Sequence, residues 1–201
     1  MTPEQLYRDE CDTIRLLIDE FETTGARHFI ENADKINIMQ VRDWDEYVQP
    51  KAIPAIFGFL TGSLLVHCIS LLEFRLPILL IHSLLAAGRV VPSKLQTFRD
   101  GNIIVWMKNV VKETNGANFD FDDPLVERIE AWIRVRNDEV HYGGYRSERT
   151  KQRQIDILDG VDVGDVGTTP YDIQFVGCRN AIHDVEAFFR KTESIRAATT
   201  T

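Results

Sequence analysis

Residues 134–145 read Arg-Val-Arg-Asn-Asp-Glu-Val-His-Tyr-Gly-Gly-Tyr, and this stretch decides the expected fold and chemistry. The guanidinium of Arg136 is permanently charged and forks onto phosphate oxygens. The imidazole of His141, about one and a half helical turns further on, exchanges a proton near neutral pH. Two glycines follow and should end the helix, so we expect the pair at an exposed helix end. A cation and a proton carrier so placed are a minimal set for attacking a phosphodiester.

The helix that carries this stretch should begin at Asp123-Pro124, because an Asp cap and a Pro in the first turn are typical start signals. Its expected apolar face consists of Leu125, Ile129, Trp132 and Ile133. Asn137 and His141 are four positions apart and should share a face, whereas Arg136 lies about 140° round the helix from His141.

Upstream, residues 56–74 form a strongly apolar run that predicts a helix, and Pro77 is expected to kink or break it. A second apolar run, residues 78–87, stops at Gly88. The uncharged span 52–72 is long enough to resemble a membrane helix, but its polar interruptions favour a buried helix of a bundle.

The remaining pattern is also mainly helical. We expect a first helix from Thr2-Pro3 that fades near Gly25, two shorter helices at 93–99 and 103–112, and a last helix that begins at Thr169-Pro170. Residues 151–168 alternate apolar and polar positions around Asp159-Gly160, which predicts a small hairpin or structured loop. Residues 26–54 suggest only a short extended piece near Ile36 and Ile38 and a helical turn at 43–47.

Length and composition agree with a single domain over residues 1–201. A chain of 201 residues with 44% hydrophobic content is long enough to bury a core. The net charge of −8 leaves no global basic footprint, so any RNA contact must be local. Cys11, Cys68 and Cys178 lack metal-ligand spacing and suggest reduced, buried thiols; with an acidic, polar N-terminus we expect a cytoplasmic protein.

The Arg-Asn-x-x-x-His stretch followed by Gly resembles the signature of the HEPN superfamily, in which four to six residues separate Arg from His and a polar residue follows the Arg. Ser70-Leu71-Leu72-Glu73 upstream and a long C-terminal helix follow in the order of that family, so the resemblance covers about residues 55–190. The variant it most resembles is the compact type of prokaryotic defence systems. The resemblance implies an all-α, HEPN-like helical bundle with a core at about residues 55–190 and the helix at 3–23 packed on it. The hairpin or loop would be an insertion before the last helix.

The resemblance also implies a metal-independent endoribonuclease without a cofactor. Arg136 would hold the scissile phosphate, His141 would transfer a proton with the 2′-hydroxyl of RNA, and Asn137 would orient the His or contact phosphate. Glu73 is our candidate for the acid that family members often place near the pair, although a partnership with Arg75 or Arg89 is an equal alternative. Two such motifs facing each other in a homodimer would form a composite active site. The role would be that of a toxin or of phage defence, with an antitoxin or defence-system protein as a further partner.

The stretch around the motif is locally basic in an acidic protein and carries two tyrosines. Basic residues between aromatic ones could grip an RNA backbone and stack bases. The expected RNA-binding residues are Arg134, Tyr142, Tyr145, Arg146 and Arg149. A solvated surface loop is the competing interpretation. Some family members carry Tyr two residues after the His, and Gly143 stands there, which argues against a function that depends on that Tyr.

Three alternatives stay open. Arg136 and His141 could simply stabilise a helix C-terminus, where cations are favoured. The domain could bind RNA without cleaving it, or act as a regulatory subunit that holds a protein through residues 56–87. Arg179 and His183 resemble the motif with only three residues between them, and we interpret them as helix surface that could line a dimer face.

Overall fold

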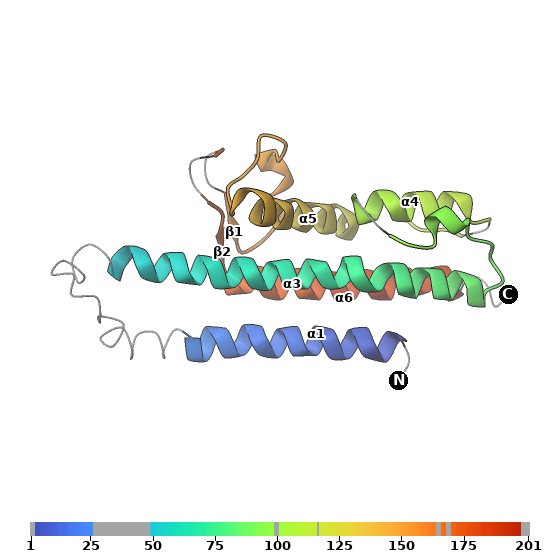
Figure 1. The fold of residues 1–201 in the computed structure, drawn as a ribbon, viewed down its shortest axis with the longest axis horizontal. Coiled ribbons are helices and arrows are strands. Elements are labelled where there is room, and N and C mark those ends of the chain that lie inside the picture. The colour runs from blue at the N-terminus through green and yellow to red at the C-terminus, as the bar shows by residue number, and fades with distance from the viewer. Residues whose placement is uncertain are drawn as a thin grey trace.

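The long helices of the computed structural model lie side by side along one axis (Figure 1). They are α1 (Pro3–Glu20), α3 (Gln49–Ala86), α5 (Pro124–Tyr142) and α6 (Phe175–Ala197). α3 and α6 pack on each other in the middle, with α1 on one side of them and α5 on the other. The structure describes residues 3–25, 49–98, 101–115, 117–163, 166–167 and 170–197. The extended piece expected near Ile36 and the turn at 43–47 lie outside these residues.

α1 covers one face of the α3–α6 pair, as the sequence predicted for residues 3–23. It passes into a π-helical segment, η1 (Phe21–Gly25). The ring of Tyr7 stacks on that of Phe189, with 4.7 Å between ring centroids. The ion pairs Arg15–Glu186 and Glu10–Arg75 fasten its rim to the same two helices. Apolar burial at the centre and charge pairs at the edges hold an amphipathic helix in this way.

α3 is one continuous helix, so the predicted break at Pro77 is wrong. Proline inside a helix removes the N–H that would bond the carbonyl of Glu73 and costs about 3 kcal/mol. Side chains on the core face repay this cost, since each fully buried leucine contributes roughly 2 kcal/mol. The leucines nearest to Pro77 on this face are almost completely buried: Leu72, Leu76, Leu80 and Leu84. Packing therefore decides the course of the helix and local propensity does not.

The link from α3 to α5 contains a 3-10 turn, η3 (Ser93–Leu95), and the helix α4 (Ile103–Glu113). The helix expected over 93–99 is reduced to that turn, whereas the helix expected over 103–112 is confirmed. Asn102 caps α4, because its side-chain oxygen accepts from the amide of Ile104 at 2.8 Å. α4 lies roughly in line with α5 on the same side of the α3–α6 pair.

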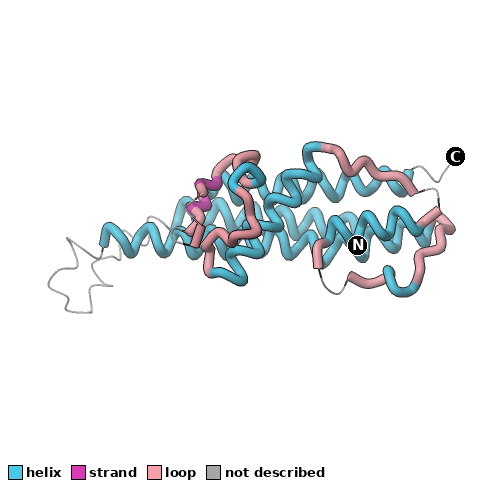
Figure 2. The backbone as a smooth tube through the Cα atoms, turned by 90° about the horizontal axis from the view of Figure 1, so that it is seen from above, coloured by secondary structure: helices cyan, strands magenta, loops and turns pink. Residues whose placement is uncertain are grey.

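The hairpin expected around Asp159-Gly160 does not form: of the described residues in 151–168 only 161–162 are a strand. β1 (Val161–Asp162) pairs antiparallel with β2 (Asp172–Ile173), whose residues we had assigned to the last helix. That helix starts later, at Phe175, and a 3-10 turn, η4 (Gln152–Gln154), precedes β1. The two strands lie among loops at one end of α5 (Figures 1 and 2). Tyr171 and Ile173 are buried while Asp172 is exposed, so the local period is that of a strand.

The buried side chains form one continuous apolar cluster drawn from α1, α3, α4, α5, α6 and the loop before β1. The structure is therefore mostly helical, and the all-α class is confirmed. Residues 58–86 of α3 are long and apolar enough to cross a membrane by length and composition, but half of the most apolar window is buried inside the protein. Such a helix is common at the centre of a bundle and carries little weight as a membrane span.

Candidate functional site

The two ends of α5 are set by the residues that the sequence indicated. Asp123 caps the first turn, and its carboxylate accepts from the amide of Leu125 at 2.7 Å while also pairing with Lys191 of α6. At the other end Gly143 adopts a left-handed conformation with φ of 63°, which a residue with a Cβ adopts only at a cost. His141 is therefore held in the last turn, as predicted.

Asp138, one turn before the end of α5, fastens the chain that follows it. Its carbonyl accepts from the amides of Gly143 and Gly144, the latter at 3.3 Å. Its buried carboxylate accepts from the hydroxyl of Tyr171 at 2.7 Å and from the amide of Ser147 at 3.2 Å. Burial and the neighbouring carboxylate hold the pKa of Tyr171 far above its usual range, so this phenol stays a donor. The end of α5 is thus locked to the segment before β2.

Arg136 points toward α3 and pairs with Glu73. Its Nη2 donates to Oε1 of Glu73, and the two side chains are only 14% and 20% exposed. The alternative partners of Glu73 are engaged elsewhere, since Arg75 pairs with Glu10 and Arg89 donates to the carbonyl of Asn115. Among the residues that the structure describes, no partner is found for the buried Nε of Arg136. The guanidinium is therefore only partly used by its carboxylate.

His141 does not join Arg136 within one chain. It is exposed in the last turn, about 140° round the helix from Arg136. Asn137, on the face of His141, is half-buried. In the described part of the chain the structure gives His141 no hydrogen bond or ion pair. The chain thus brings Arg136 and Glu73 together and leaves the imidazole of His141 exposed.

Glu139 is a residue of the site that the sequence analysis missed. Its carboxylate lies between α3 and the turn after α5, where a Cβ added to Gly62 would come within 2.6 Å of Oε2 and one added to Gly144 within 3.0 Å of Oε1. Burial, reinforced by the charge of Asp138, raises its pKa from 4.5 to about 7. A carboxyl that exchanges its proton near neutral pH therefore lies one turn from Arg136. The two glycines were visible in the sequence, but nothing there connected them with Glu139.

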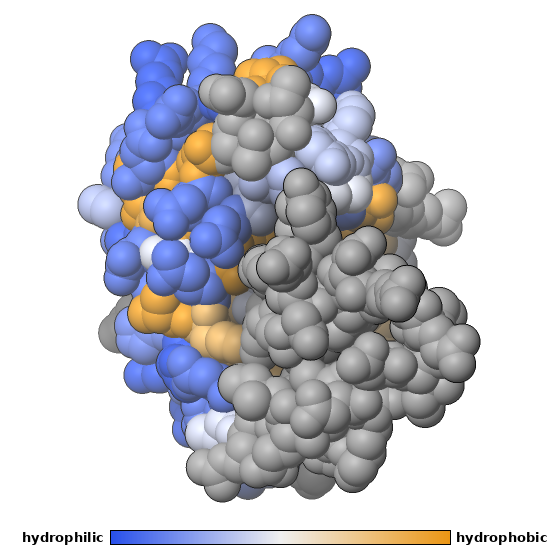
Figure 3. Space-filling model, turned by 90° about the vertical axis from the view of Figure 1, so that its left-hand side faces the viewer, coloured by the Kyte–Doolittle hydropathy of each residue, from blue (hydrophilic) through white to orange (hydrophobic). Residues whose placement is uncertain are grey.

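The predicted RNA-binding residues lie at the same end of α5 but do not form a uniform surface. Tyr142, Tyr145 and Arg149 are exposed, whereas Arg134 and Arg146 are half-buried. The backbone of Tyr145 forms a bridge with Pro170, and the buried Nε of Arg146 has no partner within the described residues. Figure 3 views the molecule from this end, where hydrophilic residues predominate among those coloured and hydrophobic patches lie between them.

Two further expectations concern metals and thiols. Within the described ranges, no group of three or more His, Cys, Asp or Glu side chains is placed to hold a metal ion. Cys11, Cys68 and Cys178 are free and buried, as predicted. Arg179 of the second Arg/His stretch pairs with Asp19 and Glu22, so it lies against the chain's own N-terminal helix.

Comparison of the chain with protein-family models, with curated proteins and with solved structures finds no match. The helical architecture and the geometry at the end of α5 are therefore the observations on which a function can be argued.

Proposed function

We propose that this protein is a metal-independent endoribonuclease of the HEPN type. The observation that carries the proposal is the Arg136–Glu73 pair. Two residues from separate motif segments, 63 positions apart in the chain, meet at the end of the helix that also carries His141. A half-buried arginine with donor capacity left over, near an exposed imidazole, suits the binding and cleavage of a phosphodiester.

The roles follow from what each group can do. Arg136 would donate to a non-bridging phosphate oxygen and stabilise the charge that builds up on phosphorus, while Glu73 holds the guanidinium in place. His141 would remove the proton of the 2′-hydroxyl. The 2′-oxygen then bonds to phosphorus, the bond to the 5′-oxygen breaks, and that oxygen takes a proton. The products would be a 2′,3′-cyclic phosphate and a 5′-hydroxyl.

A second subunit would supply the second proton carrier. The attacking 2′-oxygen and the leaving 5′-oxygen lie on opposite sides of phosphorus, so a second imidazole would serve as the acid, and we propose a homodimer in which two motifs face one cleft. The outer face of α3 supports this arrangement, because it exposes four large apolar side chains to solvent: Phe59, Phe74, Ile78 and Leu85. Phe74 is 63% exposed and directly follows Glu73. Dimer contacts on this face would bring the two Arg136–Glu73 pairs close together.

The biological setting that fits a small ribonuclease of this kind is the cytoplasm, as a toxin or in phage defence. A protein partner such as an antitoxin would then control it. Exposed apolar residues beside the motif, Val140 and Tyr142, offer such a partner a contact surface next to His141.

A second candidate function is a HEPN-like module that binds RNA or protein without catalysis. The specific observation in its favour is again the Arg136–Glu73 pair, because a carboxylate that neutralises the arginine weakens its attraction for phosphate. The net charge of −8 points the same way. Under this hypothesis His141 only stabilises the end of α5.

Cleavage of end-labelled RNA in EDTA, with His141→Ala and Arg136→Lys beside the wild type, tests the proposal. His67→Ala is the matched control, because His67 is also an exposed helical histidine but lies on α3. We expect cyclic-phosphate ends from the wild type and from His67→Ala, and a loss of at least about hundredfold in the other two. Equal cleavage by all four proteins would exclude the site. Binding without cleavage by a folded dimer would favour the non-catalytic module.

Sedimentation analysis of the wild type and of Phe74→Glu tests the dimer separately. The wild type should sediment as a dimer at micromolar concentration, and the variant as a folded monomer without nuclease activity. A wild-type monomer that cleaves RNA would contradict the composite site.

A further inference from the structure

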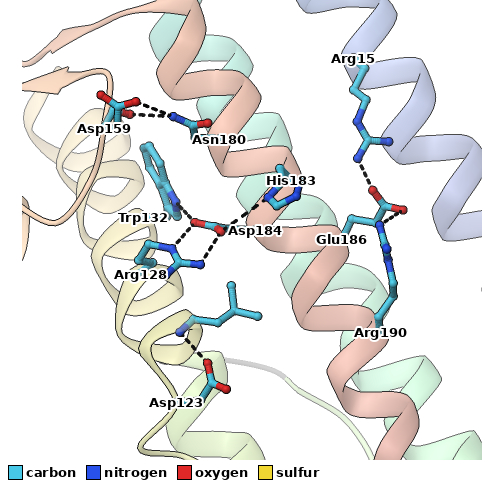
Figure 4. Close-up of polar contacts among 11 residues, drawn as sticks. Arg15, Asp123, Arg128, Trp132, Asp159, Asn180, His183, Asp184, Glu186 and Arg190 are labelled. Carbon is cyan, nitrogen blue, oxygen red and sulfur yellow. Dashed lines mark hydrogen bonds and ion pairs between the residues drawn. The ribbon is translucent and has the colours of Figure 1, made fainter.

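A pocket lies in the groove between α5, α6 and the loop before β1, on a surface that the proposed nuclease chemistry does not use. Its volume is about 270 Å³, just below the usual range of small-molecule sites. Ile157 and Leu158 of the loop form an apolar wall, and the opposite sides carry polar groups from the two helices. Figure 4 shows how these polar side chains converge from α5, α6 and the loop.

The floor of the pocket is a rigid polar network. Asp184 of α6 is only 7% exposed, and its carboxylate accepts from Nε and Nη2 of Arg128 at 3.0 and 2.9 Å. The indole Nε1 of Trp132 donates to the same carboxylate at 3.1 Å. A buried charge with three donors holds its partners in fixed positions. This network therefore presets the direction of the Arg128 guanidinium and the edge of the indole ring.

The rim of the pocket has further donors and acceptors that face solvent. Arg128 is 37% exposed and has used Nε and Nη2 on Asp184, which leaves Nη1 directed away from it. His183 is exposed, with Nδ1 at 4.0 Å from Oδ1 of Asp184. Across the pocket, the carboxylate of Asp159 accepts only a long bond of 3.4 Å from the amide of Asn180, among the bonds that the described residues show. The guanidinium donor of Arg128 thus stands opposite a carboxylate acceptor.

Charge decides which part of a ligand fits. Arg128 and Asp184 cancel, and Asp159 makes the pocket net negative, so a phosphate is disfavoured there. A planar, neutral ring with donors on one edge and acceptors on the next is favoured. Guanine has this pattern, with N1–H and N2–H donors for a carboxylate and O6 and N7 acceptors for an arginine, whereas adenine presents only one exocyclic donor group.

We propose that this pocket binds a guanine base. The carboxylate of Asp159 accepts from N1–H and N2–H, Nη1 of Arg128 donates to O6 or N7, and the ring lies against Ile157 and Leu158. The base belongs either to single-stranded RNA, whose unpaired bases are read on their edges, or to a free guanine nucleoside. The inference holds whether or not the protein cleaves RNA. Trp132 lies one helical turn from Arg136, so in the first case the bound base would be a near neighbour of the proposed site.

Calorimetric titration with guanosine, adenosine, inosine and guanosine monophosphate tests the proposal. The protein titrated is His141→Ala, in which no cleavage is expected. Guanosine should bind at least about tenfold more tightly than adenosine, and inosine, which lacks the N2 amino group, should fall between them. The monophosphate should gain nothing over guanosine, because the pocket repels its charge.

Asp159→Asn and Asp162→Asn form a matched pair of variants. Both acids are exposed, and each accepts a hydrogen bond from a side-chain amide: Asp159 from Asn180 and Asp162 from Gln174. Only Asp159 lines the pocket. Asp159→Asn should lose the preference for guanosine, and Asp162→Asn should keep it. An unchanged preference in a folded Asp159→Asn protein, or no preference in the parent, would overturn the proposal.

A single-stranded oligonucleotide with one guanosine, compared with the same strand carrying adenosine, separates the two sources of the base. Tighter binding of the guanosine strand than of guanosine itself assigns the pocket to RNA. Equal affinity assigns it to a free nucleoside. A preference for the adenosine strand would contradict the assignment of guanine.

Discussion

Replacement of Glu139 by Gln should make the protein more stable at pH 8 and leave its stability nearly unchanged at pH 4. Gln keeps the shape of the side chain between Gly62 and Gly144 but cannot ionise. In the folded protein burial raises the pKa of Glu139 from 4.5 to about 7. Between these values the unfolded chain ionises while the folded chain keeps its proton. The wild type therefore loses stability as the pH rises through this window, and the loss levels off above about pH 7.

The size of the effect follows from the same values. Each tenfold change in proton affinity is worth about 1.4 kcal/mol, so the whole rise in pKa from 4.5 to about 7 would correspond to a free energy on the order of 3 kcal/mol. Glu139 is only half-buried, and solvent screens part of this cost, so we expect about 1–2 kcal/mol. This is a measurable share of the total stability of a domain of this size.

Urea unfolding followed by circular dichroism at pH 4, 6, 7 and 8 measures this difference. Glu148→Gln is the control, because Glu148 is an exposed acid in the loop just after α5. The control should follow the wild type at every pH. If Glu139→Gln were less stable than the wild type at pH 8, the ionised carboxylate would have to be engaged by donors, and the explanation by burial would be refuted.

Three other predictions concern packing. Gly160→Ala should lower the free energy of unfolding in urea by about 2–4 kcal/mol, because φ is 82° and a Cβ there would collide with the backbone of Gly177. Gly58→Ala should instead raise it by about 0.5–1 kcal/mol, because no atom lies near the new methyl group. Pro77→Ala should raise stability by about 1 kcal/mol, since the regained helix bond outweighs the lost ring burial, and a lower midpoint in urea would contradict this. At pH 8 the three cysteines should react with a thiol reagent at least about a hundredfold more slowly in the native protein than in urea, because burial raises their pKa values. Fast reaction of the native protein would show that the helices open.

Local patterns were sufficient where a helix end depends on its own residues. Asp123-Pro124 and Gly143 predicted both ends of α5 correctly, because caps and left-handed glycines act within a few residues. Local patterns failed at Pro77 and at residues 170–173. At Pro77, burial of the leucines on the core face of α3 outweighs the lost hydrogen bond. At residues 170–173, pairing with β1 supplies partners that a helical pattern could not reveal.

The proposed site divides in the same way. The sequence from Arg136 to His141 determines that an arginine and a histidine lie near one end of the same helix, because spacing along a helix depends on the chain alone. Only the packing of α3 against α5 decides that Glu73 meets Arg136 rather than Arg75 or Arg89. The same packing buries Glu139 beside Gly62 and raises its pKa. Desolvation and long-range ion pairs depend on which elements meet in space, and for that reason the sequence could name the proposed reacting groups but not their environment.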